Sequence, residues 1–213
     1  MLDLLVNTFV ILVVVIDPIG LSPMFAALTH GETPAYQQRM AVKGTALAAG
    51  VLVVFVLVGD GLLRALGISL AAFRIAGGVL LFLLAIDMVF ARHSGLRSTT
   101  LREQAEAEQR KDISVFPLAI PMIAGPGAIT TVLLTVGNQP SLMTSLVFLL
   151  VLAMVLLLTL GALLLAPRIM AVMGETGANV VTRTLGIVLA ALAVQFMLDG
   201  LAAGVHLMPV AHP

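Results

Sequence analysis

The sequence contains no cysteine, no tryptophan and a single tyrosine among its 213 residues. Without cysteine the chain has no disulfide, no thiolate metal ligand and no thiol nucleophile. The shortage of aromatic residues leaves little for the Trp and Tyr belts that flank many membrane helices. Charge is also scarce, since Lys, Arg, Asp and Glu make up 10% of the chain and the formal net charge is +0. A balanced charge gives no indication of a nucleic-acid or acidic partner.

The remaining composition is that of an integral membrane protein. Hydrophobic residues make up 60% of the chain and the mean hydropathy is +1.14, whereas soluble domains are about 45–50% apolar. The N-terminus lacks the basic flank of a secretory signal, so we expect an uncleaved first helix. A membrane helix needs roughly 20 apolar residues. Six stretches qualify, at about Leu4–Leu28, Met40–Val58, Ile68–Phe90, Ile113–Val136, Ser141–Ala166 and Val180–Leu201.

Helix breakers and charges complete the expected topology. Gly59-Asp60-Gly61 is expected to end the second span, and Pro167 to end the fifth. Nine of the eleven Lys and Arg residues fall on the side of the loops after spans one, three and five. Because positive charge stays in the cytoplasm, we expect a cytoplasmic, solvated and partly helical loop over 91–112. Both termini are then periplasmic.

The two halves of the chain share a weak pattern. Pro18 corresponds to Pro126, 108 positions on, and Arg74-x-x-Gly77 corresponds to Arg183-x-x-Gly186, 109 positions on. Three spans in each half reverse the second half relative to the first, which gives the inverted-topology repeat of many secondary transporters. We therefore predict an all-α integral membrane protein of six transmembrane helices. Its parts are a three-helix repeat at 1–90, the loop at 91–112 and a second three-helix repeat at 113–213.

Two unusual stretches interrupt the first and fourth spans. IDPIGLSPMF begins at Ile16, and IPMIAGPGAITT begins at Ile120. The 13 residues from Leu4 to Ile16 cover only about 20 Å as a helix, so the chain continues through Asp17-Pro18 at membrane depth. Unpaired backbone groups are costly in lipid, so we expect two broken helices beside a polar cavity. The alternative is a pair of proline kinks that only shape the packing.

Broken helices have the polarity to bind a small zwitterion. The N–H groups at the start of each half-helix attract a carboxylate, and the carbonyl groups freed before a break can meet an ammonium or a cation. We therefore predict a substrate site in the middle of the membrane. Its candidate residues are Asp17, Pro18, Gly20, Ser22, Gly125, Pro126, Gly127, Thr130, Thr131 and Gln195.

Two acids within the spans are candidates for proton coupling. A carboxylate at the bilayer centre usually faces a cavity or a partner, so Asp17 can bind an ammonium or carry a proton. Alternatively, Asp17 caps the half-helix that follows by accepting the N–H of Ile19 or Gly20. Asp87 is either a second group facing the cavity or an interfacial acid near Arg92.

Arg74 and Arg183 occupy equivalent places near the starts of the third and sixth spans. They are either snorkelling side chains or gate residues that clamp the carbonyl groups freed by the breaks. In the same spans, Gly77-Gly78 and Gly186 predict smooth faces on which helices pack closely.

The remaining polar side chains of the spans have two interpretations each. Ser22, Thr130 and Thr131 follow the breaks, and they either bind the solute or donate to carbonyls of their own helices. Gln195 and Asp199 are four residues apart and share a helix face. Gln195, near mid-span, is the candidate for lining the cavity, and Asp199 is expected at the interface.

The sequence shows none of the catalytic motifs that we considered. Its four histidines show no metal-ligand spacing and lie in loops or tails, at His30, His93, His206 and His212. Neither G-x-S-x-G nor H-E-x-x-H occurs. We therefore predict no catalytic residue, no metal and no cofactor. The expected partners are a small-molecule substrate and the lipid bilayer, with no nucleic acid, and a homo-oligomer is left open.

Four motifs carry a family resemblance: DPIGLSPMFAALT, FRIAGGVLLFLLAIDMVF, FPLAIPMIAGPGAIT and RTLGIVLAALAVQFMLDG. In this order they resemble the MarC family of bacterial inner-membrane proteins over nearly the whole chain. The resemblance implies six membrane helices and a transport role, and for one branch the movement of small neutral amino acids such as glycine and alanine, coupled to protons. It aligns the family's two motifs with Asp17, Pro18, Gly20 and Pro23 and with Gly125–Gly127. Many members have an amide where Asp17 stands.

Together these observations favour a secondary transporter in a bacterial inner membrane. We expect it to move a small solute, above all a small neutral amino acid, by alternating access, with proton coupling as an option. The alternative is a passive channel or facilitator for a small polar metabolite.

Overall fold

The computed structural model of the chain describes residues 2–91, 112–138 and 142–207. These residues form seven α-helices and one irregular helical segment, η1, and they include no β-strand. Nearly all of the predicted loop at 91–112 lies outside the described residues. The elements are α1 (Leu2–Ile16), α2 (Pro18–Leu28), α3 (Pro34–Ala65), α4 (Leu70–Phe90), η1 (Ser114–Ile123), α6 (Pro126–Asn138), α7 (Leu142–Leu164) and α8 (Ala166–Leu207).

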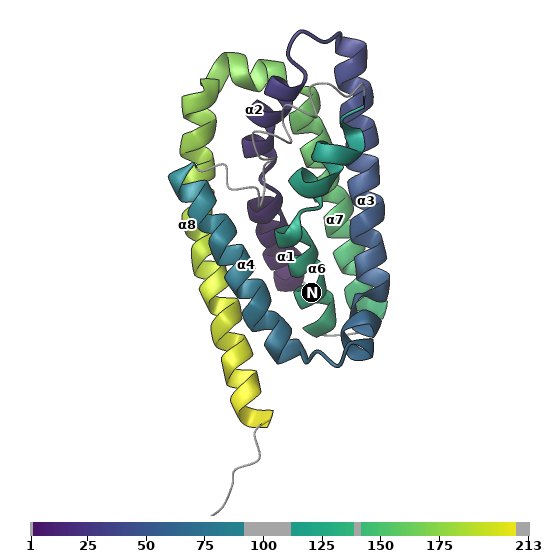
Figure 1. Cartoon of the computed structure of the whole chain (residues 1–213), viewed down its shortest axis with the longest axis vertical. Helices are drawn as coiled ribbons and strands as arrows, with labels where there is room; N and C mark the ends of the chain where they lie inside the picture. The colour runs from purple at the N-terminus through teal and green to yellow at the C-terminus, as the bar shows by residue number, and fades with distance from the viewer. Residues whose placement is uncertain (1, 92–111, 139–141, 208–213) are drawn as a thin grey trace, which may run out of the picture.

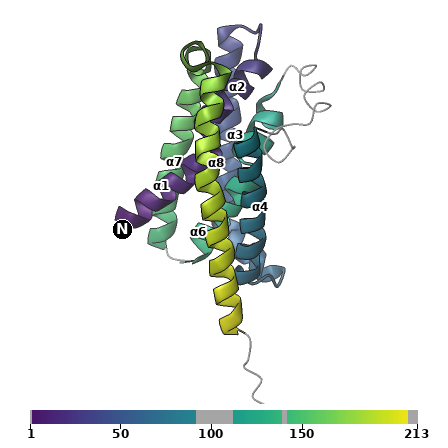
Figure 2. The same cartoon turned by 90° about the vertical axis from the view of Figure 1, so that its left-hand side faces the viewer.

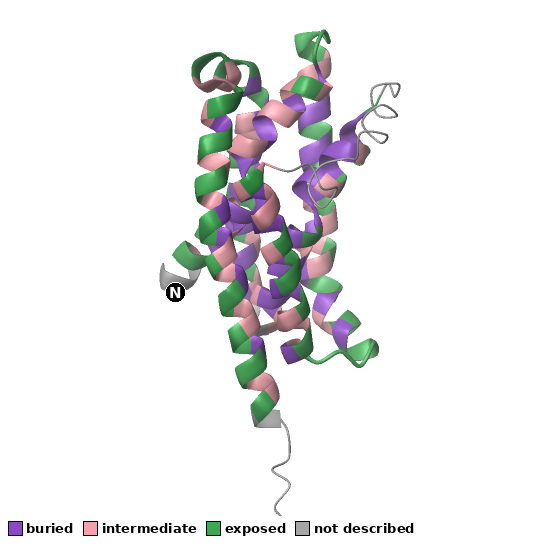
Figure 3. Cartoon of the chain, turned by 60° about the vertical axis from the view of Figure 1, so that its left-hand side comes forward, coloured by how far each residue is buried: buried purple, intermediate pink, exposed green. Residues whose placement is uncertain are grey.

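The helices have the length and the surface of membrane spans. Five spans are long and apolar enough to cross a bilayer, or six when the bent pair η1 and α6 counts as one. Large apolar side chains are exposed on the outer helix faces (Figure 3), among them Leu57, Leu157 and Ile187. An apolar surface of this extent suits lipid and not water. The prediction of an all-helical integral membrane protein is therefore confirmed.

The breaks of both interrupted spans lie in the interior of the bundle. In Figure 1 the pair α1–α2 and the pair η1–α6 lie between α4 and α8 on one side and α3 and α7 on the other. Figure 2 shows the same helices from the α8 side, with successive spans alternating in direction. The start of α3 and the junction of α7 with α8 lie at one end of the bundle, and α4 ends nearer to that end than it begins (Figure 1).

The largest helix–helix interface joins α4 to α8. Glycines allow this approach from both sides. A Cβ added to Gly78 of α4 would lie 2.6 Å from Cγ of Met197, and one added to Gly186 of α8 would lie 2.9 Å from Cβ of Met88. Small residues let membrane helices approach to backbone contact, so the predicted packing role of Gly78 and Gly186 is confirmed.

Glycines of the outer helices also receive side chains of the second broken span. A Cβ added to Gly44 of α3 would lie 2.4 Å from Cδ2 of Leu118, and one added to Gly77 of α4 would lie 2.3 Å from Cγ2 of Thr130. Leu118 and Thr130 are themselves buried. These contacts hold η1 and α6 against the helices that surround them.

The predicted end of the second span at Gly59-Asp60-Gly61 is wrong, because α3 continues to Ala65. Tertiary packing and a local ion pair outweigh the low helix propensity of glycine. Gly59 is buried, and a Cβ there would lie 2.0 Å from Cδ2 of Leu133 on α6. Asp60 pairs with Arg64 one turn later, at 2.8 Å.

The last helix differs from the predicted span at both ends. Pro167 comes after the end of α7 and lies in the first turn of α8. At that position the N–H that proline lacks would have no partner within the helix. The helix turns at Gly174, which has φ 62° and ψ 178°, and then continues to Leu207. α8 therefore exceeds the predicted Val180–Leu201 span on both sides.

Candidate functional site

The first break is one residue wide and is formed by Asp17. This residue has φ 47° and ψ 72°, the left-handed conformation that aspartate tolerates better than most residues. Its N–H donates to the Val13 carbonyl at 2.8 Å, and its own carbonyl accepts the N–H of Leu21 at 3.1 Å. Pro18 follows as the first residue of α2, a favoured proline position. The backbone is thus hydrogen-bonded on both sides of the break.

The Asp17 carboxylate is fully buried and joins three segments of the chain. Its Oδ1 accepts the N–H of Gly20 at 3.0 Å, so the predicted capping of α2 is confirmed. Its Oδ2 accepts the hydroxyl of Thr182, on α8, at 2.9 Å. Sequence reasoning missed Thr182; the only local signal was a hydroxyl residue beside Arg183 in an apolar span.

Gly20 is required beside this carboxylate. A Cβ added to Gly20 would lie 2.1 Å from Oδ2 of Asp17 and 2.5 Å from Oγ1 of Thr182. Both distances are far below van der Waals contact, so any side chain at position 20 would displace one of these groups. Gly20, Asp17 and Thr182 therefore form one packed polar unit, which we call the first-break cluster.

The second break is wider than the first. Within η1, Phe116 and Ile120 have extended backbone angles, because the residue before a proline is disfavoured in the helical region. A regular helix resumes at Pro126, and α6 is bent by 54° from η1. Gly125 and Gly127 are buried on either side of Pro126, which is exposed.

A small cavity lies at the second break and reaches Val15, near the end of α1. Its lining residues are Val15, Leu84, Pro121, Met122, Ile123, Gly125, Gly127 and Ala128. Its size is that of about one water molecule. A Cβ added to Gly127 would lie 3.3 Å from Cγ1 of Val15, two residues before Asp17. The two breaks therefore lie side by side in the protein interior.

The hydroxyl groups near the breaks bond to backbone carbonyls in this conformation. Ser22 donates to Pro18 of its own helix at 3.1 Å and approaches the Ala162 carbonyl of α7 at 3.4 Å. Thr131 donates to the Gly127 carbonyl at 2.9 Å. Thr130 is buried with its methyl group against Gly77. Of the two interpretations of Ser22 and Thr131, the structure shows the bond within the helix.

The other candidate residues do not line this small cavity. Gln195 is exposed on α8 and donates to Asp199 at 2.8 Å, so it does not line the cavity described above. Asp87 is half-buried in the last turn of α4. Arg74 is half-buried near the start of α4, where it packs against Gly200 of α8. Arg183 is exposed.

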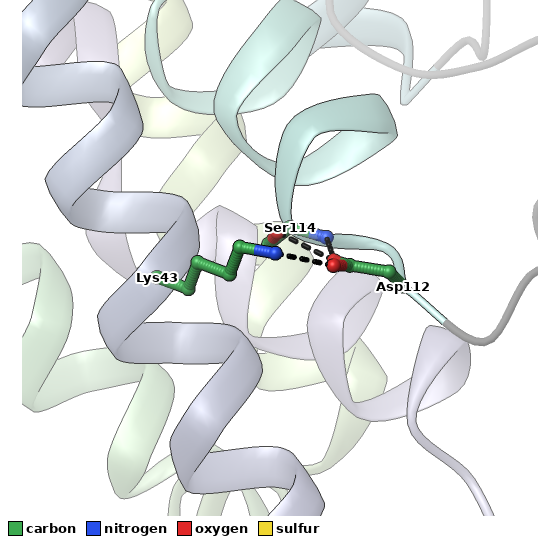
Figure 4. A network of polar contacts seen from close by, with 3 residues as sticks. All are labelled: Lys43, Asp112 and Ser114. Atoms are coloured by element: carbon green, nitrogen blue, oxygen red, sulfur yellow. Dashed lines mark hydrogen bonds and ion pairs between the residues drawn. The ribbon is translucent and has the colours of Figure 1, made fainter.

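A separate polar cluster fastens the start of η1 to α3 (Figure 4). Lys43 forms an ion pair with Oδ2 of Asp112, and Oδ1 of Asp112 accepts the backbone N–H of Ser114 at 3.0 Å. The hydrogen bonds from Lys43 and Ser114 hold the pKa of the Asp112 carboxyl well below its usual range. None of these three residues lines the small cavity at the second break.

The fold and the breaks define a multi-span helical membrane protein with two interrupted helices and a buried carboxylate at the first interruption. The chain belongs to the MarC family, since the model described as "MarC family integral membrane protein" matches residues 2–205.

Curated relatives match along nearly the whole chain. It is 32% identical to the UPF0056 membrane protein YhcE of Escherichia coli (strain K12), over 91% of this chain and 89% of that protein. It is 34% identical to the UPF0056 membrane protein YvbG of Bacillus subtilis (strain 168), over 94% of this chain and 95% of that protein. It is also 34% identical to a UPF0056 membrane protein of Archaeoglobus fulgidus, over 92% of this chain and 91% of that protein. No solved structure matches.

Proposed function

We propose that this protein is a secondary transporter of a small neutral amino acid, of the size of glycine or alanine, that works by alternating access. The observation that carries the proposal is the Asp17 carboxylate, fully buried at a helix break inside the bundle. An ionisable group at such depth is costly and usually serves an ion or solute pathway. Asp17 is therefore also the first candidate for coupling to protons.

The two breaks offer complementary chemistry to a zwitterion. The Asp17 carboxylate suits an ammonium group. The N–H groups of Gly127 and Ala128 lie in the first turn of α6, and both residues line the small cavity. The start of a helix favours an anionic group, so this turn suits a carboxylate. Val15, two residues before Asp17, lies against Gly127, so the end of α1 and the start of α6 are close together in the interior.

The small size of the cavity favours a carrier over an open pore. Space for about one water does not admit an amino acid, so a solute enters only when the surrounding helices move. We infer that the halves at 1–90 and 113–213 are inverted repeats that move relative to each other. In support, the first and fourth spans are both broken and run in opposite directions (Figure 1).

We also propose the orientation given by the charge bias. The start of α3 and the junction of α7 with α8 lie at the same end of the bundle (Figure 1), and the stretches of sequence after spans one, three and five hold most of the Lys and Arg residues. That end then faces the cytoplasm, with both termini in the periplasm of a bacterial inner membrane.

Counterflow in proteoliposomes tests this function. Vesicles loaded with glycine, alanine, serine or a larger amino acid are supplied with labelled solute, with and without a pH gradient. We expect the labelled solute to accumulate, in a saturable manner, only in vesicles loaded with the small amino acids. Flux without counterflow would favour the passive facilitator, and no flux of any amino acid would remove this substrate class.

Asp17→Asn tests the coupling role within the same assay. The amide retains an oxygen that can accept the Gly20 N–H, so the cap of α2 and the expression level should persist. We expect uptake by this variant to lose its dependence on the pH gradient. Asp60→Asn, which removes an acid paired with Arg64 near the end of α3, is the matched control. Unchanged gradient dependence in Asp17→Asn would remove the proton-coupling role.

A further inference from the structure

We propose that Thr182 is the gate residue of α8: its hydroxyl closes the first break by occupying Oδ2 of Asp17, and it must leave before a solute can reach the carboxylate. This inference rests on the proposed function and adds a residue that the motifs do not contain. The bond of 2.9 Å joins positions that are 165 residues apart in the chain.

The two carboxylate oxygens of Asp17 have different structural roles. Oδ1 accepts the N–H of Gly20 and so belongs to the start of α2. Oδ2 accepts a hydroxyl from a different helix. The contact to Oδ2 can open when α8 moves, and the cap of α2 can remain in place. Oδ2 is therefore the oxygen that can exchange the Thr182 hydroxyl for the ammonium of a solute.

On the side of Gly20, the packing around Oδ2 and the Thr182 hydroxyl leaves no room for a further atom. A single carbon atom added to Gly20 would lie 2.1 Å from Oδ2 and 2.5 Å from Oγ1 of Thr182. Asp17 is fully buried, whereas Thr182 is half-buried on the face of α8 that contacts α2. The hydroxyl thus lies between the buried carboxylate and the more accessible side of α8.

α8 has a feature that permits such a movement. Gly174 interrupts the helix eight residues before Thr182, with φ 62° and no neighbouring atom within 4 Å of an added Cβ. A positive φ in open space allows the two parts of α8 to change their relative angle more easily than a continuous helix does. The segment that carries Thr182 can therefore move while the α7–α8 junction remains in place.

A thiol-labelling experiment tests the closure without any assumption about the solute. The natural chain has no cysteine, so Ala178→Cys creates a single thiol. Ala178 is fully buried and lies one turn before Thr182 on the same helix face. The labelling rate with N-ethylmaleimide is measured in membranes for this variant alone and combined with Thr182→Val, Thr182→Ser or Thr184→Val.

We expect Thr182→Val to raise the labelling rate about fivefold or more, because a buried thiol reacts only when the structure opens locally. Thr182→Ser keeps the hydroxyl and should leave the rate within about twofold of the single-cysteine protein. Thr184 donates only within α8, to the Val180 carbonyl at 2.9 Å, so Thr184→Val is the matched control. An unchanged rate in Thr182→Val, or an equal increase in Thr184→Val, would overturn the proposal.

Counterflow of glycine then separates this inference from the proposed function. If the Thr182 hydroxyl competes with the solute for Oδ2, Thr182→Val should lower the half-saturating concentration by about threefold to tenfold, and Thr182→Ser should restore it. A raised or unchanged half-saturating concentration in Thr182→Val would show that the hydroxyl does not compete with the solute. Absence of counterflow in the natural protein, together with fast labelling of Thr182→Val, would remove the transport function and leave the closure in place.

Discussion

Gly78 of α4 lies so close to Ala193 of α8 that a Cβ on the glycine would be 2.8 Å from the alanine carbonyl oxygen. The same Cβ would lie 3.1 Å from the backbone nitrogen of Met197. Backbone atoms, unlike side-chain ends, cannot rotate away. The two helices that end the first and second halves of the chain are therefore in backbone contact.

Gly78→Ala should destabilise the protein, because α4 and α8 must separate to admit the methyl group. Overpacking of this kind costs about 1–3 kcal/mol. The measurement is the temperature at which half of the detergent-solubilised protein is lost from its monodisperse chromatographic peak. Gly50→Ala on α3, where an added Cβ meets nothing within 4 Å, is the control and should not lower this temperature. Equal behaviour of the two variants would contradict the close α4–α8 packing.

Gly20→Ala should abolish most of the transport activity, with a smaller effect on the amount of folded protein. The added methyl group pushes the Asp17 carboxylate or the Thr182 hydroxyl out of the first-break cluster, and loss of a charged hydrogen bond costs about 1.5–3 kcal/mol. Counterflow rate per folded molecule is the measurement. Activity above about half of the natural rate would show that the cluster can rearrange without loss of function.

Gly127→Val should block the small cavity at the second break. A Cβ there already lies 2.8 Å from Cδ2 of Leu84 and 3.3 Å from Cγ1 of Val15, so the two further methyl groups must enter the cavity. We expect the counterflow rate to fall about tenfold or more, which corresponds to a loss of about 1.4 kcal/mol or more of interaction free energy with the solute. The matched control is Gly161→Val on α7, where nothing lies within 4 Å of an added Cβ. Retained transport in Gly127→Val would place the solute elsewhere.

Asp112 should give the protein a pH-dependent contribution to stability. Because its pKa is lowered in the folded protein by hydrogen bonds from Lys43 and Ser114, the contribution is fully present above the ordinary value of about 3.9. This contribution to stability is lost as the pH falls toward the lower pKa that Asp112 has in the folded protein. Solvent screening limits it to at most about 1 kcal/mol, because the Lys43 and Asp112 side chains are 45% and 46% exposed.

Thermal denaturation of Asp112→Asn, followed from pH 8 to pH 3, checks this expectation. The variant should be slightly less stable than the natural protein at neutral pH, and the difference should narrow below about pH 4. Lys43→Met should lose a similar amount at neutral pH. A difference that stays constant down to pH 3 would contradict the role of the ionised carboxylate.

Several parts of the site could be predicted because they depend on local chemistry. Proline and glycine in the first and fourth apolar stretches indicated the breaks, since a proline removes an N–H and constrains the residue before it wherever it occurs. The capping of α2 by Asp17 followed from the position of an acid directly before a helix start. The apolar composition likewise determined the helical membrane class.

Helix ends were predicted less well, because they depend on what the helix meets. Gly59-Asp60-Gly61 has the composition of a helix terminus, yet Leu133 of a distant span packs against Gly59 and the helix continues. Gln195 lies at mid-span and yet is exposed, bonded to Asp199. The neighbouring helices decide which face of a uniformly apolar helix is buried. The sequence of the helix itself therefore predicts its buried face poorly.

The sequence by itself determined that this protein resides in a membrane, that two of its spans are interrupted and that an acid stands at the first interruption. Composition, proline chemistry and capping decide these features within a few residues. Only the tertiary structure decided that the two interruptions meet through Val15 and Gly127 and that Thr182 bonds to Asp17. Those contacts join residues more than a hundred positions apart, and they form only when all the spans have packed into one bundle.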